Sequence, residues 1–275
     1  MALIQANFTS MCLKRTVQFN AILPADQMTA FYAPAKLPLK TFYILHGYTG
    51  SCMDWFLNSE LGDLSSKYGL AFIMPDAENH FYVDDMKRRD LYGEFIGSEL
   101  VEFTRRMFPL SNKAEDTIIG GVSMGGYGAL RNGLKYNNVF GHVIAVSPAI
   151  IMQELQTATD EPNPVGATRG FYESVFGDLD KAAESDMDLH WLVNNLHENG
   201  ATFPDIYIAC GYNDMLVYES RRLDGHLKAL GIKHAYEEGH GTHDYEFFNA
   251  YLRHALDRLN LNQPAALPNP FWVDR

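Results

Sequence analysis

One stretch of the sequence constrains the fold more than any other. A short β-branched run over residues 117–119 predicts a buried strand, and a helix-compatible segment over residues 129–135 follows it. Between them lies Gly121-x-Ser123-x-Gly125, a serine with a glycine two residues to either side. In this strand-turn-helix context the pattern predicts a nucleophile elbow, with Ser123 in a strained backbone conformation and its hydroxyl above the sheet. The pentapeptide alone is a weak signal, so the prediction depends on partner residues elsewhere.

Further apolar runs alternate with helical patterns along the chain. The predicted strands cover residues 41–45, 70–74, 142–146, 206–210 and 234–238, and the predicted helices cover residues 61–68, 92–108 and 244–259. Residues 2–23 predict one or two antiparallel strands that close an edge of the sheet. Continuous apolar strands are typical of a parallel sheet with both faces covered. The 275 residues, 47% of them hydrophobic, therefore predict a single α/β domain over 1–275, with a mostly parallel central sheet and helices on both faces.

Residues 149–204 interrupt this alternation. They contain a polar, proline-bearing loop followed by aromatic residues, among them Phe171 and Phe176. One interpretation is a connection that covers the sheet. The other is a cap-like insertion over the active site, in which Phe171 and Phe176 supply apolar walls, because long loops in compact domains are often functional.

A serine nucleophile needs a base within hydrogen-bond reach and an acid that orients the base. In this fold the chain order is serine, then acid, then histidine, each after a strand. Asp214 lies three residues after Gly211, which ends a predicted strand, and His243 lies between the last strand and the last helix. Asp214 could instead cap a helix near residue 215, and His240 competes with His243 as the base.

The oxyanion of an acyl-transfer intermediate needs two backbone donors. One should be the N–H of Met124, the residue after the nucleophile, and the other should come from the loop after the first parallel strand. Tyr48 is the predicted second donor because it follows a glycine there, and His46 is expected to order that loop. Phe81 and Tyr82 are candidates for the substrate pocket or, equally, for packing.

Composition narrows the partners and the compartment. There are 22 Lys+Arg against 34 Asp+Glu, without a basic run, so neither nucleic acid nor an anionic membrane surface is an expected partner. Three scattered cysteines and the lack of a signal peptide or a long apolar run predict a cytoplasmic protein. The acidic pairs at 84–85 and 178/180 have no histidine cluster beside them, so no metal site and no cofactor are expected.

The chain resembles the tributyrin esterase and acetylesterase group of the α/β-hydrolases, which is close to esterase D and S-formylglutathione hydrolase. The resemblance covers most of the chain. It is carried by Leu45-His46-Gly47 with Trp55 downstream, the segment 121–129, Cys210-Gly211-x-x-Asp214 and Gly241-x-His243-Asp244-Tyr245. It implies an α/β-hydrolase fold, serine carboxylesterase activity on short acyl esters, a Ser123, Asp214 and His243 triad, and oxyanion donors at Tyr48 and Met124. Trp55 joins the pocket candidates. The chain departs from the family at two places that bear on substrate preference. It has Tyr48-Thr49 where the family often has Met-Ser, and it has Thr242 and Tyr245 where the family often has Gly and Trp.

The expected function is therefore hydrolysis of a small acetyl-type ester through an acyl-enzyme. A thioesterase of the S-formylglutathione hydrolase type, an acyltransferase, and a non-catalytic binding module remain alternatives. The sequence leaves open the physiological ester and the oligomeric state, with a homo-oligomer as one option.

Overall fold

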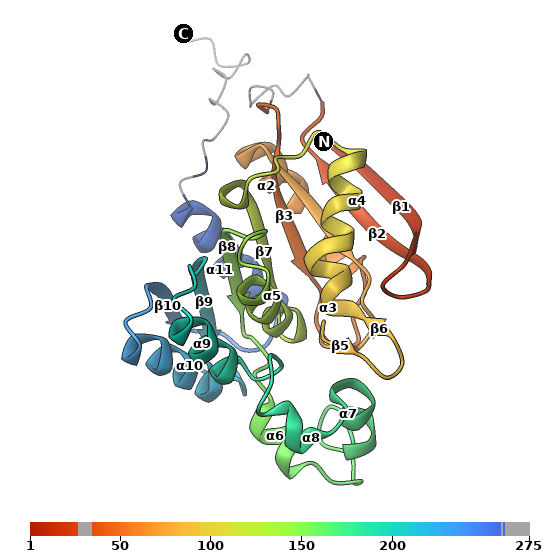
Figure 1. Ribbon diagram of the computed structural model, residues 1–275. Coiled ribbons are helices and arrows are strands. Elements are labelled where there is room, and N and C mark those ends of the chain that lie inside the picture. Colours follow the sequence, from red (N-terminus) through yellow and green to blue (C-terminus); the bar gives the residue numbers. More distant parts are fainter. Residues whose placement is uncertain (27–34, 260, 262–275) are drawn as a thin grey trace.

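A computed structural model of the chain describes residues 1–26, 35–259 and 261. Within them lies an eight-stranded sheet in the order β1-β2-β4-β3-β7-β8-β9-β10 (Figure 1). Its strands are β1 Ala2–Ser10, β2 Arg15–Leu23, β3 Lys40–Leu45, β4 Leu70–Pro75, β7 Thr117–Val122, β8 His142–Val146, β9 Asp205–Gly211 and β10 His234–Gly239. Strands β5 (Asp84–Asp85) and β6 (Asp90–Leu91) form a separate small hairpin. The predicted domain over 1–275 also includes residues 27–34, 260 and 262–275, which lie outside the described residues.

The strand directions confirm the predicted sheet. Strand β2 pairs antiparallel with both β1 and β4, and every other neighbouring pair in the large sheet is parallel. Strands β4 and β7 are buried along their whole length, as expected for strands covered on both faces. Because parallel strands end at one edge, the residues that follow β3, β7, β9 and β10 meet there.

Helices cover both faces of the sheet (Figure 1). They are α1 Asp54–Asn58, α2 Leu61–Tyr68, α3 Tyr92–Glu94, α4 Leu100–Met107, α5 Met124–Lys135, α6 Met152–Thr157, α7 Arg169–Phe176, α8 Leu179–Ala182, α9 Leu189–Glu198, α10 Val217–Ala229 and α11 Tyr245–Arg258. A π-helical turn (Phe95–Glu99) joins α3 to α4, and a short 3₁₀ turn (Ala114–Asp116) precedes β7. Apolar residues of α4, α5, α9 and α10 pack in the core on one face, and those of α2 and α11 pack on the other.

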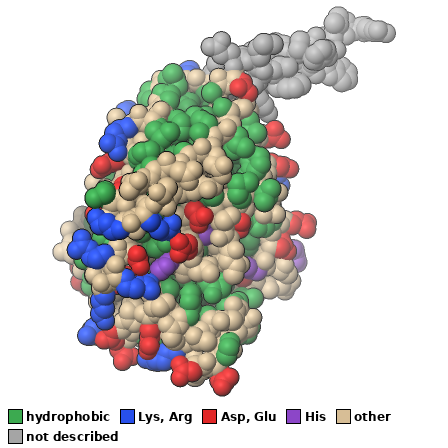
Figure 2. Space-filling view, turned by 90° about the vertical axis from the view of Figure 1, so that its right-hand side faces the viewer, with side chains coloured by type: hydrophobic (Ala, Val, Ile, Leu, Met, Phe, Trp, Pro, Cys, Tyr) green, Lys and Arg blue, Asp and Glu red, His purple; other side chains and the backbone are tan. Residues whose placement is uncertain are grey.

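One outer face of the molecule lies at the right-hand side of Figure 1, where β1 forms the edge of the sheet. Figure 2 shows that hydrophobic side chains gather on the upper part of this face. Acidic and basic side chains lie interspersed over its lower part (Figure 2). This face therefore carries no extended area of a single charge.

The segment between β8 and β9 contains α6, α7, α8 and α9. Helices α6, α7 and α8 lie beyond the edge at which the parallel strands end, apart from the layers on the sheet (Figure 1). Helix α9 returns to the body of the molecule, where it contacts α5 and α10. The segment predicted as one insertion is thus divided between an outlying group of short helices and a helix that covers the sheet.

Two helices differ from their predicted extents. Helix α5 begins at Met124, five residues before the predicted segment 129–135, although Gly125, Gly126 and Gly128 disfavour a helix by intrinsic propensity. Packing explains the glycine at position 128. A Cβ there would lie 2.3 Å from the Tyr82 ring, so only glycine lets the helix pack this closely. The predicted helix over 92–108 is confirmed in position, but the π-helical turn interrupts it.

A buried ion-pair network ties three segments together. The Arg131 guanidinium on α5 is fully buried and lies 3.2 Å from Asp84 in β5 and 2.8 Å from Asp186 in the segment before α9. Lys135 contacts the same two carboxylates, and Arg131 also donates to the Tyr82 carbonyl. These contacts fix the loop around residue 82 and the end of the 149–204 segment against the helix that follows Ser123.

Replacing Arg131 should therefore destabilise the fold. Arg131→Met should lower the free energy of unfolding by about 2–4 kcal/mol, because it leaves partly buried carboxylates short of a partner. The matched control is Arg169→Met, which removes an exposed pair with Glu173 and should cost about 0.5 kcal/mol or less. Urea unfolding measures both changes, and equal losses in the two variants would contradict a structural role for the network.

Candidate active site

Ser123 lies in a tight turn between β7 and α5. Its φ of 55° and ψ of −121° are unusual for a residue with a side chain, so the turn stores strain. The conformation is held by hydrogen bonds from Ser123 N–H to the Val146 carbonyl (3.1 Å) and from Ala149 N–H to the Ser123 carbonyl (2.9 Å). The predicted elbow geometry is therefore present at Ser123.

The two glycines of the elbow are required by space. A Cβ on Gly121 would lie 2.7 Å from the Leu45 carbonyl oxygen, and a Cβ on Gly125 would lie 2.4 Å from the same atom. Both distances are far below a normal van der Waals contact. The absence of side chains thus lets the end of β3 approach the turn that carries Ser123.

His243 and Asp214 lie together at the same edge of the sheet. His243 Nδ1–H donates to Asp214 Oδ2 at 2.9 Å, while Leu216 N–H donates to Oδ1. Burial opposes ionisation of Asp214, but the hydrogen bonds from His243 and Leu216 outweigh it and hold the pKa of this carboxyl below its ordinary value. Asp214 therefore orients the histidine and also accepts a hydrogen bond from the turn beyond β9. It is not the cap of a helix, because α10 follows Leu216 and has no side-chain cap.

The competing histidine is directed elsewhere. His240 is exposed, and its ring packs edge-on against Tyr212 at 5.4 Å. The His243 ring instead packs edge-on against Phe248 at 5.1 Å, at the start of α11, whose first turn is capped by Asp244. A rigid helix end therefore supports His243.

Ser123 and His243 line one cavity of about 130 Å³. No hydrogen bond joins their side chains, within the described part of the chain. Hydrogen bonds between catalytic groups often form fully only when the substrate binds. The other lining residues are mostly apolar: Tyr48, Phe81, Met124, Ala149, Ile151, Glu154, Val165, Ala167, Phe171, Tyr172, Met215 and Leu216.

The loop after β3 carries Tyr48 beside the elbow, since a Cβ on Gly47 would lie 3.5 Å from Ser123 Cβ. The Gly47 carbonyl accepts hydrogen bonds from His46 Nδ1–H (2.8 Å) and from Gly50 N–H (3.1 Å). That carbonyl and the Tyr48 N–H belong to one planar trans peptide unit and point in opposite directions. Fixing the carbonyl therefore fixes the direction of the Tyr48 N–H.

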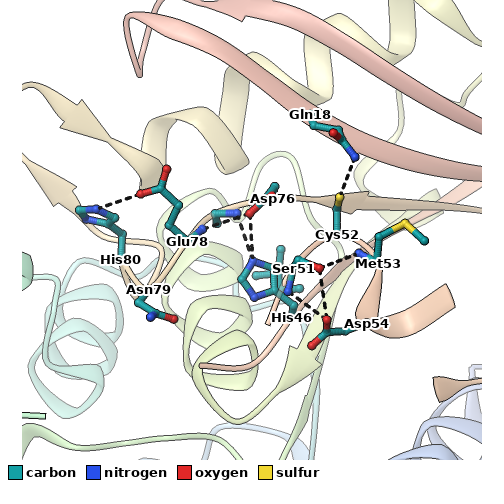
Figure 3. Close-up of polar contacts among 12 residues, drawn as sticks. Gln18, His46, Ser51, Cys52, Met53, Asp54, Asp76, Glu78, Asn79 and His80 are labelled. Atoms are coloured by element: carbon teal, nitrogen blue, oxygen red, sulfur yellow. Dashed lines mark hydrogen bonds and ion pairs between the residues drawn. The ribbon is translucent and has the colours of Figure 1, made fainter. Parts of the chain in front are cut away.

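His46 is held as a neutral imidazole. Its ring is 1% exposed, and its Nε2 accepts a hydrogen bond from the Ala77 N–H at 3.1 Å. Figure 3 shows the ring directed toward Asp76. Burial lowers the pKa of His46, despite the opposing effects of the Gly47 carbonyl and Asp76. The predicted role of His46 in ordering the loop agrees with these contacts.

A second hydrogen bond holds the loop after β3 further along the chain. Thr49 N–H donates to Asn79 Oδ1 at 2.7 Å, at a position where Thr49 has a φ of 64°. The Tyr48 backbone is therefore fixed from both sides.

Three of the predicted pocket residues do not line the cavity, and the expectation is corrected for them. Trp55 is 1% exposed and packs under the loop, with its indole N–H donating to the Leu45 carbonyl at 2.9 Å. Tyr82 is buried and donates its hydroxyl to the His46 carbonyl. Phe176 packs in the core against Phe81 and Tyr127. Phe171 does line the cavity, as predicted.

Several cavity residues carry no signal in the sequence. Glu154 and Tyr172 come from α6 and α7 of the 149–204 segment, and Met215 and Leu216 follow Asp214. Only their position in or next to segments expected near the site could have suggested them. Among residues 1–26, 35–259 and 261, no group of three or more His, Cys, Asp or Glu side chains is arranged to hold a metal ion.

Removing the His46 ring should lower turnover more than binding. His46→Leu loses the donor to the Gly47 carbonyl, so we expect kcat for an acetyl ester to fall about 10- to 100-fold, short of the full loss of an oxyanion donor. His46→Asn keeps a short donor and should fall less. Steady-state kinetics on folded protein, checked by circular dichroism, would contradict this role if His46→Leu kept a normal kcat.

Comparisons with known proteins agree with this geometry. Residues 10–259 match the model of a family described as "Putative esterase". The chain is 44% identical over 262 residues to an acetyl esterase of Caldicellulosiruptor saccharolyticus, covering 94% of this chain and 98% of that protein.

Two solved structures from Staphylococcus aureus are also similar. One is the S-formylglutathione hydrolase FrmB, with a TM-score of 0.80 and 25% identity. The other is FphF, a fluorophosphonate-binding serine hydrolase, with a TM-score of 0.82 and 25% identity. Each alignment covers 94% of this chain and 98% of the other chain. The fold is thus that of the α/β-hydrolase esterases.

Proposed function

Because this chain belongs to the esterase family whose model it matches, and is a carboxylic ester hydrolase, we propose that it cleaves short acyl esters of the acetyl type through Ser123, His243 and Asp214. One observation carries the assignment of residues. The His243–Asp214 hydrogen bond of 2.9 Å lies at the cavity that also contains the strained Ser123 turn. Each of these three residues follows a strand of the parallel sheet.

The reaction then proceeds in two acyl-transfer steps. His243 Nε2 accepts the Ser123 proton as Ser123 Oγ attacks the ester carbonyl, and His243 next protonates the departing alcohol. Water, deprotonated by the same nitrogen, releases the acid from the acyl-enzyme. Asp214 accepts the Nδ1–H throughout, so the ring presents Nε2 to the serine and its cationic form is stabilised.

The tetrahedral oxyanion is bound by the N–H groups of Tyr48 and Met124. Neither N–H donates a hydrogen bond to another described residue, so both are available to a ligand. Met124 is the first residue of α5, so its N–H also lies at the positive end of a helix dipole. The orientation of the Gly47 peptide supports Tyr48 as the second donor.

The cavity supports a short acyl group. Its volume of about 130 Å³ corresponds to about four groups of the size of a water molecule. Phe171, Val165 and Ala167, from the outlying part of the 149–204 segment, form one wall. We propose that this part is the cap that limits the size of the ester.

Two alternatives use the same residues. A thioesterase is favoured by the likeness to an S-formylglutathione hydrolase, and hydrolysis of a thioester compared with the oxygen ester of the same acyl group separates it from an esterase. An acyltransferase would prefer an alcohol acceptor to water. A binding module without catalysis would fail to react with a fluorophosphonate.

The expected surroundings of the protein are also proposals. Among the described residues, no helix combines the length and apolar character needed to cross a bilayer. All three cysteines are unpaired, which supports the reducing cytoplasm as the compartment. The partner is a small ester, and a homo-oligomer remains an option to be tested by the mass of the protein in solution.

Removing the nucleophile should abolish activity. Ser123→Ala should reduce hydrolysis of 4-nitrophenyl acetate at least about 1,000-fold, because only oxyanion binding remains to assist water. Ser66→Ala, a serine change on α2, is the matched control and should retain activity. Near-normal turnover by Ser123→Ala would refute the proposed mechanism.

Acyl length should be limited by the cavity. In a series of 4-nitrophenyl esters, kcat/KM should be highest for chains of up to about four carbons and should fall about tenfold or more by eight carbons, because the longer chain exceeds the available space. Rates that rise steadily to eight carbons would contradict the proposed cap.

A further inference from the structure

The cavity next to Ser123 has a single carboxylate among its lining residues. That residue is Glu154, on α6, and the lining contains no lysine or arginine. Most of the other lining side chains are apolar. In a binding site of this kind, the few polar groups fix the orientation and the class of the ligand.

Glu154 is held by two neighbours from the same segment. Its Oε1 accepts hydrogen bonds from the Tyr172 hydroxyl (2.8 Å) and from Asn163 Nδ2. Asn163 Nδ2 also donates to the Tyr172 oxygen at 3.0 Å, which closes a small triangle of polar groups. The carboxylate is therefore fixed in place, although its residue is exposed.

The second oxygen of Glu154 differs from the first. Its Oε2 accepts no hydrogen bond within the part of the chain that the structure describes. A carboxylate with one fixed oxygen and one open oxygen can accept a hydrogen bond from a hydroxyl or an ammonium group. Negative charge on a ligand would instead be repelled, without a cation in the lining to offset it.

We propose that Glu154 forms a subsite that selects esters bearing a hydroxyl donor or a cationic group and rejects esters bearing a carboxylate. The inference rests on the proposed function, since it names the substrate class of the same cavity. Tyr172 and Asn163 are positioning residues in this subsite, because they act through Glu154. Tyr48, whose ring packs against Phe171 at 5.6 Å, also lines the cavity.

The proposal separates this chain from a glutathione thioesterase on physical grounds. A glutathione thioester carries two carboxylates and one ammonium group, so its net charge is negative, and proteins bind carboxylates with arginine or lysine. The cavity lining offers a carboxylate instead. Small esters of neutral, hydroxylated or cationic alcohols and acids are therefore the favoured substrates, and glutathione thioesters are disfavoured.

Two series of small esters test the subsite, because the charged group could lie on either side of the ester bond. The alcohol series contains acetylcholine, 2-hydroxyethyl acetate, propyl acetate and 2-carboxyethyl acetate. The acyl series contains the ethyl esters of glycine betaine, glycolic acid and propionic acid, and monoethyl malonate. For each enzyme variant, kcat/KM is measured by acid release and expressed as the ratio of the cationic to the anionic ester.

Glu154→Gln keeps the side-chain shape and an oxygen that accepts from Tyr172, but removes the charge. It should lower kcat/KM for the cationic ester about threefold and raise kcat/KM for the anionic ester about threefold. The ratio of the two should therefore fall about tenfold in at least one series. Glu173→Gln is the matched control, since it removes a carboxylate from α7 that does not line the cavity. Its ratios should stay within about twofold of those of the unmodified protein.

The outcomes separate the two proposals. If the unmodified protein hydrolyses propyl acetate but the Glu154→Gln ratios are unchanged in both series, the subsite is refuted and the esterase mechanism stands. An equal change in Glu173→Gln would also refute it, since the effect would then reflect the overall charge. If no uncharged ester is hydrolysed by folded protein, the proposed function itself fails.

Discussion

The close approach of two backbone segments sets the geometry of the whole site. The turn around Ser123 lies against the end of β3, and a Cβ on Gly125 would be 2.4 Å from the Leu45 carbonyl. This contact places the loop with Gly47 and Tyr48 next to the serine. Any side chain at Gly121 or Gly125 would force the two apart, so the proposed oxyanion donors and the proposed nucleophile depend on one packing constraint.

The second constraint is electrostatic and concerns the direction of a single peptide unit. The buried neutral His46 ring donates to the Gly47 carbonyl and accepts from the Ala77 N–H. It thereby links the loop after β3 to the loop after β4, which also carries Asn79 and Phe81. The Arg131 network fixes the far end of that second loop against α5. Distant parts of the chain thus converge on the position of the Tyr48 N–H.

The sequence predicted the parts of the site that follow strands. Ser123, Asp214 and His243 could be found because a parallel sheet brings its strand ends to one edge. Glycine ends β9 and β10, and Gly121 lies one residue before the end of β7. The walls of the cavity could not be found in the same way. Glu154 lies on α6, whose six residues are too few to show a period. Tyr172 shares the buried face of α7 with Val175 and Phe176, but such a period does not distinguish a cavity wall from core packing. The pocket prediction for Trp55 was wrong, and of the two roles predicted for Tyr82 only packing is found. An aromatic residue near a site can line a pocket or serve as buried support, and local sequence does not distinguish the two.

The central claim is that Ser123 carries the acyl group during the reaction. The direct test mixes the protein with excess 4-nitrophenyl acetate, quenches it in acid within one turnover, and locates the acetyl group by peptide mass spectrometry. The account predicts an acetyl group on the peptide that contains Ser123, formed at the rate of the 4-nitrophenol burst and lost during turnover. A burst with the acetyl group on another residue, or turnover without any acetylated peptide, would contradict it.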